Sequence, residues 1–350
     1  MQGNIKQINN TFPVTHAQAV YVNEHDTLDE YIEARKIVSV KDFGAIGDGV
    51  TDDSQAIQGA LNSLRESGGE VFFPKGTYLI NNSIIFYSNM RLNFAKNATI
   101  LRGKSDLNVL FLSYADDVTG GYDGIHHTEI IGATFDLNES FDTHGGAIAF
   151  IHANKLKIKN CTFRNMAGTW HYIECNGSTN IFIENNIFEK VRTSSFSAEL
   201  IQIDGSQDNA VYPWAGLKDG TVCTDITIRN NFFEGNGFSP AIGNHTNMAH
   251  TNVYIYGNLF KNFYTDVDSD RAGHRGVINF VNLQKNTLIF DNQFINFTKA
   301  IISFGKNTDT MVYNNVFIGN KYALQAGCTF INNLLEQSDG TLKFIASGTV

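Results

Sequence analysis

The chain has 350 residues, 17% of them charged, a formal net charge of −9 at neutral pH, and 27 phenylalanines. So many large apolar side chains exclude an intrinsically disordered chain, and the negative charge disfavours nucleic acid and other polyanionic partners. No apolar run is long enough to span a membrane and no secretory leader opens the sequence, so we predict a soluble protein with no membrane partner.

Residues 1–37 differ from the rest and carry no motif with recognisable chemistry. Residues 3–10 are polar, and a short helix is expected from Asp26, which can cap it and is followed by acids in the first turn. We predict an attachment or oligomerisation segment over 1–37, with a disordered leader as the alternative. One further domain then covers residues 38–350.

Residues 38–80 combine a strand, a glycine-rich turn and an amphipathic helix. A strand over 38–44 and a tight turn over 44–49 lead into a helix that starts within 51–55, where the sequence carries a capping pattern. The helix has one apolar stripe, made by Ala56, Ile57, Ala60, Leu61 and Leu64. The glycines at 68–69 end it. We expect this helix to cover an open end of a β-structure, because an exposed sheet edge invites aggregation.

From Lys157 to Leu335 one short phrase returns seven times, as in Ile183-Glu-Asn-Asn-Ile-Phe188. In six copies an asparagine stands two residues before the aromatic residue or leucine: Asn186, Asn231, Asn258, Asn292, Asn315 and Asn333. Cys161 takes that place in the first copy. The copies are spaced by about 18 to 45 residues, which is typical of solenoid repeats.

The repeat predicts an all-β chain wound as a parallel β-helix, one phrase to each coil. Stacked coils would align the asparagines in a hydrogen-bonded ladder and the phenylalanines in an inner stack, with longer spacings extruded as loops from one corner. A β-sandwich with chance Asn-rich turns is the alternative, and seven copies in phase disfavour it.

Two segments carry a family resemblance: VSVKDFGAIGDGVTDDSQAIQGAL at 38–61 and GGEVFFPKGTYLI at 68–80. Together with the coil repeats, they resemble the pectate-lyase-like superfamily of right-handed β-helix proteins. The resemblance implies a right-handed, single-stranded parallel β-helix with an N-terminal capping helix. It is specific for the fold and not for the reaction, because the group contains hydrolases, lyases and adhesins.

The group also includes phage tail spikes and polysaccharide depolymerases, and this implies partners. Tail spikes of this kind are homotrimers, so we expect a homotrimer that attaches to a phage tail or baseplate through its N-terminus. The expected location is the virion or the extracellular space, and the expected ligand is a bacterial surface polysaccharide.

A second strand aligns through the coils and gathers the candidate catalytic residues. Ile148, Ile173, Ile201, Ile278 and Ile302 are predicted to share the inward position. The residues that follow them are predicted to face solvent: Ala149, Glu174, Gln202, Asn279 and Ser303. Titratable groups on this face concentrate at Glu174, Asp204 and His245. Such a concentration on an otherwise neutral sheet suits general acid–base catalysis.

The expected spacing of two carboxyl groups suggests a reaction. Glu174 and Asp204 would lie on adjacent strands, two residues out of register, about 8 Å apart at the backbone. That separation suits an inverting glycosidase, in which one carboxyl group protonates the glycosidic oxygen and the other activates water. We hypothesise this pair without assigning the roles, with His245 orienting or tuning it. Glu199 is a fourth candidate, beside His171, and these two are as easily a structural pair at a bend.

Sugar-binding candidates lie mainly in two insertions. Tyr212 and Trp214 offer aromatic faces that suit sugar rings, and Asp208 is a further acid in the same insertion. His171 and Gln202 line the predicted face. Arg271 and Arg275, in a second insertion, could bind an anionic sugar, although a solvated loop is the commoner outcome.

No cofactor or metal site is predicted. The residues Asp-Val-Asp-Ser-Asp at 266–270 suggest calcium, but Arg271 replaces the glycine and Val277 the terminal glutamate that a calcium-binding loop requires.

The four cysteines, Cys161, Cys175, Cys223 and Cys328, contain no CxxC pair. Three lie in or beside predicted strands, where a small buried thiol is expected.

Three functions remain open from the sequence. The first is a tail-spike-like depolymerase that hydrolyses a bacterial surface polysaccharide. The second is a polysaccharide (uronate) lyase, which would need a base such as His274 or a lysine, and arginine or calcium to neutralise the uronate. The third is a receptor-binding tail protein without catalysis.

Overall fold

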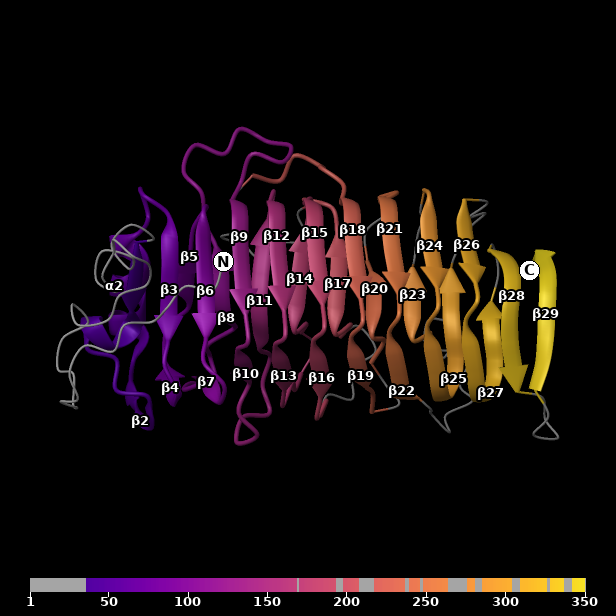
Figure 1. Ribbon diagram of the computed structural model, residues 1–350, viewed down its shortest axis with the longest axis horizontal. Helices are drawn as coiled ribbons and strands as arrows, with labels where there is room; N and C mark the ends of the chain where they lie inside the picture. Colours follow the sequence, from indigo (N-terminus) through magenta and orange to yellow (C-terminus); the bar gives the residue numbers. More distant parts are fainter. Residues whose placement is uncertain are drawn as a thin grey trace, which may run out of the picture.

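The computed structural model describes residues 36–168, 170–192, 198–207, 217–236, 239–245, 248–263, 276–280, 285–303, 309–325, 328–336 and 342–349. Of the predicted attachment segment, only Lys36 and Ile37 lie within this described part. The chain winds as a right-handed parallel β-helix around one elongated core, with the N-terminal coils at one end and the C-terminal coils at the other (Figure 1). None of the helices among the described residues has the length and apolar character needed to cross a membrane.

Three parallel sheets form the walls of the helix, and each complete coil adds one strand to each. The first sheet contains β5 (Ile84–Phe86), β8 (Val109–Ser113), β11 (Gly146–Ile151), β14 (Ile173–Asn176), β17 (Ile201–Asp204), β20 (Ile242–Asn244) and β23 (Ile278–Phe280). The second contains β1 (Ile37–Ser39), β3 (Gly69–Phe73), β6 (Met90–Phe94), β9 (His126–Ile131), β12 (Asn154–Lys159), β15 (Thr179–Glu184), β18 (Thr224–Arg229), β21 (Thr251–Tyr256), β24 (Thr287–Phe290), β26 (Thr310–Tyr313) and β28 (Thr329–Glu336).

The third sheet contains β2 (Asp48–Asp52), β4 (Gly76–Ile80), β7 (Ala98–Arg102), β10 (Thr134–Asp136), β13 (Thr162–Arg164), β16 (Ile187–Glu189), β19 (Phe232–Glu234) and β22 (Leu259–Phe263). Two long strands, β25 (Gln293–Ser303) and β27 (Val316–Gln325), run from the third sheet into the first. The last strand, β29 (Leu342–Thr349), pairs antiparallel with β28.

The predicted covering helix is α2 (Ser54–Ser63), at the N-terminal end of the helix (Figure 1). It buries Ile57, Ala60 and Leu61, and its Gln58 pairs with the edge strand β5. The Gln58 carboxamide donates to the Ile85 carbonyl at 3.0 Å and accepts from the Ile85 N–H at 2.7 Å. One side chain thus satisfies both main-chain groups of an edge residue, which confirms the covering role.

The predicted capping pattern does not cap α2. Asp53 stands at the N-cap, but its carboxylate accepts instead from the N–H groups of Ile46 and Gly47 in the glycine-rich turn. A capping box is found earlier, at the short 3-10 helix η2 (Val40–Phe43), where Ser39 is the N-cap and Asp42 is the third residue of the helix. The Asp53 carboxylate therefore binds the glycine-rich turn and not the N–H groups of its own helix.

The asparagine ladder forms as predicted, at the turn between the second and third sheets. Asn231 donates to Asn258 Oδ1 at 3.0 Å and to the Ile183 carbonyl at 2.9 Å, and the other ladder asparagines up to Asn333 repeat this pattern. The residue before each rung is in the left-handed region, as at Asn230 with a φ of 55°. Asparagine tolerates that conformation, which explains the Asn-Asn pairs in the repeat.

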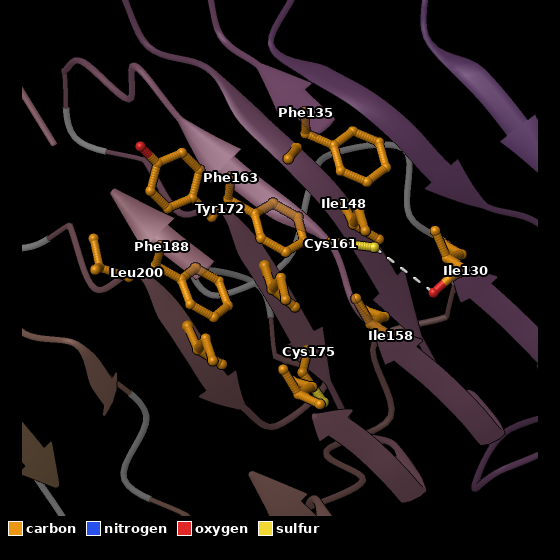
Figure 2. Packing of buried hydrophobic residues seen from close by; sticks show 14 of the residues in the cluster. Ile130, Phe135, Ile148, Ile158, Cys161, Phe163, Tyr172, Cys175, Phe188 and Leu200 are labelled. Carbon is orange, nitrogen blue, oxygen red and sulfur yellow. Dashed lines mark hydrogen bonds between the residues drawn. The ribbon is translucent and has the colours of Figure 1, made fainter. Parts of the chain in front are cut away.

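The inner phenylalanine stack is also confirmed. The rings of Phe163, Phe188 and Phe233 lie parallel with centroids 4.9 and 4.6 Å apart, and the stack continues to Phe317. Figure 2 shows this packing from Phe135 to Phe188. Because each ring contacts the rings above and below, every coil buries apolar surface that it could not bury alone.

The prediction that loops leave from one corner is wrong. The longest connection, between β17 and β18, lies where the first sheet meets the second, whereas the connection between β22 and β23 lies where the third meets the first. Both corners of the first sheet therefore carry insertions.

Candidate active site

The first sheet brings the predicted catalytic residues together in register. Glu174 pairs with Gln202 on the next strand, so Asp204 lies opposite Asn176, two residues further along. Cys175 follows Glu174 on one strand and Ile203 precedes Asp204 on the next, and both belong to the inner core. Because side chains alternate along a strand, Glu174 and Asp204 project from the outer side. The predicted two-residue offset is confirmed.

The last predicted member of the inward row is displaced by one residue. Ile278 pairs with Ile301, and Ile302 pairs with Asn279. β25 reaches the first sheet as one continuous strand from the third, so no turn resets its phase.

The outer side of this sheet is not open to solvent, contrary to the prediction. Glu174 is 4% exposed and Asp204 is fully buried, as are most of their neighbours. Part of the cover is a second apolar cluster in which Trp170 packs on Val109, Leu112 and Ala149. Among the described residues of the cluster, His245 is the one that reaches solvent, with a side chain 35% exposed.

His245 links two buried carboxylates. Its Nε2 lies 2.8 Å from Glu199 Oε2, its Nδ1 lies 3.6 Å from Asp204 Oδ2, and its backbone N–H donates to Asp204 Oδ1 at 2.8 Å. Burial alone would lower the pKa of His245, but hydrogen bonds and charge from Asp204 and Glu199 raise it to about 10. His245 is therefore a cation at neutral pH and the counter-ion of both acids.

Gln202 joins the same network from the neighbouring strand position. Its Nε2 lies 2.7 Å from Asp204 Oδ2 and 2.8 Å from His245 Nδ1. The second contact is a hydrogen bond only while Nδ1 lacks a proton, so it conflicts with the cationic ring. The two carboxylate charges outweigh one neutral amide, and we take the protonated form as the ground state.

Glu199 and His171 are confirmed as neighbours. His171 Nδ1 donates to the Glu199 carbonyl at 2.8 Å and lies 3.6 Å from Glu199 Oε2. Burial lowers the pKa of His171, so this ring is neutral and its Nε2 carries the lone pair. Gly243 makes room for the acid, because a Cβ there would lie 2.7 Å from Glu199 Cγ.

Glu174 has the electrostatic environment of a proton donor. Burial raises its pKa to about 8, against hydrogen bonds from Asn176 and Trp170 that act to lower it. Asn176 donates to Glu174 Oε1 at 3.0 Å. At neutral pH Glu174 is therefore protonated, while Asp204 accepts hydrogen bonds from Gln202 and the His245 backbone.

Three buried carboxamide oxygens of the cluster have no hydrogen-bond partner within the described part of the chain: Asn176 Oδ1, Gln202 Oε1 and Asn279 Oδ1. Each lies on a different strand of the first sheet. Leaving such an acceptor unpaired costs about 1–3 kcal/mol, so the cluster is prepared for groups that donate hydrogen bonds.

The cluster also contains one arrangement of metal-ligand type. Single donor atoms of His171, Glu199 and His245 all lie within 4.8 Å of one another. The ion pair of His245 with Glu199 already neutralises the buried carboxylate, so the geometry needs no ion.

Several predicted binding residues lie outside the described residues. These are Asp208, Tyr212, Trp214, Arg271 and Arg275, together with His274 and the Asp-rich stretch 266–270. Sequence reasoning missed one member of the cluster, Asn176, which follows Glu174 by two residues and could have been found by strand alternation. Trp170 directly precedes His171 and is therefore expected near the cluster, but nothing in the sequence indicates that its ring folds over the sheet.

Known proteins share this fold and parts of this sequence. Residues 37–197 match the family model described as rhamnogalacturonase A/epimerase, pectate lyase-like. The plasmin and fibronectin-binding protein A of Streptococcus pneumoniae is 32% identical over 263 residues, which are 64% of this chain and 36% of that protein. The tail spike protein of Shigella phage Sf6 is 35% identical over 113 residues, 30% of this chain and 17% of the tail spike. The alignments thus span about a third or less of these relatives.

A solved structure of PfbA, the Streptococcus pneumoniae surface protein and adhesin, has a TM-score of 0.66 to this chain and 27% identity. The match covers 82% of this chain and 79% of the solved one. Fold and outer cluster together define a parallel β-helix protein with titratable groups gathered on one wall. The chain has the fold of the pectate-lyase-like superfamily of right-handed β-helix proteins, and residues 37–197 match a family model of that group.

Proposed function

We propose that the chain is a depolymerase that hydrolyses glycosidic bonds of a bacterial surface polysaccharide, with Glu174 as general acid and Asp204 as general base. One observation carries the proposal. Two carboxyl groups on adjacent strands have opposite environments: burial holds Glu174 protonated, and donors surround Asp204. A pair of acids kept in different protonation states is what acid–base cleavage of an acetal requires.

The register supports a single displacement. The two-residue offset on adjacent strands places the backbones of Glu174 and Asp204 about 8 Å apart. An inverting pair needs about 6.5–9.5 Å between its carboxyl groups, which leaves room for a water molecule. Glu174 gives its proton to the leaving glycosidic oxygen. Asp204 takes a proton from the water that attacks the anomeric carbon on the opposite face.

His245 and Glu199 position and tune Asp204 in this proposal. The cationic imidazole is the counter-ion of both buried acids, and Glu199 fixes the ring from its other nitrogen. His245 also marks the way in, since it is the solvent-exposed member of the described cluster.

The unpaired oxygens of Asn176, Gln202 and Asn279 favour a hydroxyl-rich ligand. Sugar hydroxyls are donors as well as acceptors, and three donors would satisfy three buried acceptors that lack partners. A polysaccharide lying along the first sheet would meet these groups on β14, β17 and β23.

The biological setting belongs to the same proposal. Similarity to a phage tail spike and to a bacterial surface protein supports action on the virion or outside the cell. We place the protein on a phage tail as a homotrimer, attached through the N-terminal segment. Light scattering of the purified chain tests the trimer, and a monomeric mass would contradict it.

Incubation with purified bacterial surface glycans tests the activity. Mass spectrometry should find fragments whose summed mass exceeds that of the intact polysaccharide by one water for each bond cleaved. The purified protein should also clear the capsule of a susceptible host. Fragments with an unsaturated, UV-absorbing end would instead indicate a lyase.

A second function is favoured by the resemblance to the pneumococcal adhesin: glycan or host-surface binding without catalysis. In that case the protein would bind the polysaccharide and release no fragment. Glu174→Gln and Asp204→Asn would then leave binding intact and there would be no product to lose.

A further inference from the structure

The four cysteines are all free and buried, as predicted, but two of them are neighbours. Cys175 Sγ and Cys223 Sγ lie 3.7 Å apart although 48 positions separate them in the sequence. Cys175 lies in β14, between Glu174 and Asn176. Cys223 directly precedes β18 and ends the long insertion that follows β17.

The surroundings of Cys223 are polar for a core thiol. Its Sγ accepts from the Ser178 N–H at 3.4 Å and contacts the Asp204 carbonyl at 3.2 Å, and its backbone N–H donates to His250 Nδ1 at 3.0 Å. Burial would raise the pKa of Cys223, but the neighbouring Cys175 thiol and the His250 side chain lower it to about 6. Thiolate is the form that attacks a disulfide.

We propose that Cys175 and Cys223 are a redox site, which forms a disulfide on reaction with a low-molecular-weight disulfide. The sulfur atoms must approach from 3.7 Å to about 2.05 Å, a movement of less than a bond length shared by two side chains.

The reaction is an ordinary thiol–disulfide exchange. The Cys223 thiolate attacks one sulfur of the small disulfide and expels one small thiolate. Burial raises the pKa of Cys175, so this thiol gives its proton to the first released thiolate, attacks Cys223 Sγ and expels the second small thiolate. Two protein thiols are oxidised, one small disulfide is reduced to two thiols, and the protons pass to solvent and the released thiolates.

The bridge would tie the strand that carries Glu174 to the end of the insertion beside Asp204. It closes a long loop in the unfolded chain and should raise the melting temperature by several degrees. Oxidising surroundings outside the cell would favour this form. The inference does not depend on hydrolysis, because it concerns sulfur atoms on the inner side of the sheet.

Cys161 and Cys328 provide matched controls within the chain. Both are buried core thiols whose pKa is raised by burial, to about 12 and about 11, and the Cys161 thiol contacts the main-chain carbonyls of Ile130 and Lys159 (Figure 2). They should stay reduced while Cys175 and Cys223 react.

The test incubates the native full-length chain with oxidised glutathione and compares it with a reduced sample. The intact mass should fall by two hydrogen atoms, free thiols should fall from four to two, and peptide mapping should link Cys175 to Cys223. Cys161→Ser and Cys328→Ser should keep the mass change, and Cys175→Ser and Cys223→Ser should abolish it. Mapping of the wild-type chain decides the matter if a variant fails to fold. The proposal would be overturned if the native sample kept four free thiols under conditions in which a denatured sample is oxidised. Disulfide links that include Cys161 or Cys328 would also overturn it.

Discussion

Two buried rows of polar side chains run along the axis of this β-helix, and they differ in how fully their members are hydrogen-bonded. In the asparagine ladder, Asn231 is 2% exposed, and both its amide nitrogen and its oxygen have partners in adjacent coils. In the outer row of the first sheet, Asn279 is 4% exposed and its oxygen has no partner among the described residues. The two rows have similar repeat spacing and similar burial, but of Asn231 and Asn279 only Asn231, in the asparagine ladder, has both its side-chain oxygen and its nitrogen hydrogen-bonded within the described part of the chain.

The difference distinguishes structure from function. A fully paired buried network stabilises one fold, whereas a partly paired one costs free energy unless something binds to it. The outer row also contains Glu174, whose pKa is raised, and the cationic His245. The predictions below test this contrast, beginning with the largest effect.

The outer row should carry the catalysis. Glu174→Gln and Asp204→Asn should each lower kcat by about 10²- to 10⁴-fold, because each removes one proton-transfer group and preserves the shape of the side chain. Release of reducing ends from a susceptible polysaccharide measures the rate, and circular dichroism checks the fold. A rate within a few-fold of wild type for either variant would remove that residue from the mechanism.

The ladder should carry stability. Asn231→Leu should lower the free energy of unfolding by about 3 kcal/mol or more, because it leaves several buried groups unpaired, including the Ile183 carbonyl and the Asn186 N–H. Denaturant titration measures the change. A loss below about 1 kcal/mol would mean that water replaces the asparagine in the ladder.

Protonation of Glu174 should appear as a pH dependence of stability. Its folded pKa of about 8 lies above the ordinary value of 4.5, so between these pH values the folded state holds a proton that the unfolded state has lost. Stability should therefore fall as the pH rises from 4.5 to 8, by at most about 1.4 kcal/mol per unit from this group. His245, with a folded pKa of about 10 against 6.5, should continue the fall from pH 6.5 to 10.

Glu174→Gln isolates the first contribution, since it keeps a neutral side chain at every pH. The variant should flatten the decline between pH 4.5 and 6.5, make it shallower from 6.5 to 8, and leave the decline above pH 8 that comes from His245. An unchanged profile would show that Glu174 titrates near its ordinary value.

The same substitution as in the ladder should be nearly silent in the outer row. Asn279→Leu should not lower stability by more than about 1 kcal/mol, because it removes an acceptor that has no partner among the described residues. It should weaken polysaccharide binding, measured by calorimetry with an uncleavable fragment or with the Glu174→Gln variant. A loss of stability equal to that of Asn231→Leu would erase the distinction between the rows.

Much of the ladder and part of the site could be predicted from the sequence. The spacing of Asn186, Asn231 and the later copies fixes a coil, and strand alternation then places Glu174 and Asp204 with the correct two-residue offset. The coil and the offset can both be predicted because they depend on a periodic pattern within short segments of the sequence.

The rest depends on contacts between distant segments. Trp170 packs over the outer face and buries residues that alternation alone assigns to solvent. The raised pKa of Glu174 follows from that burial, and the contact between Cys175 and Cys223 follows from how a long insertion returns to the core. The one-residue displacement at Ile302 follows from a strand that continues through a corner.

The anomeric form of the first product, observed by proton NMR during cleavage, tests the central claim most directly. Glu174 as proton donor and Asp204 on the adjacent strand, with backbones about 8 Å apart, predict inversion at the anomeric carbon. A product that appears with retained configuration, or with an unsaturated ring, would contradict Glu174 and Asp204 as an inverting pair.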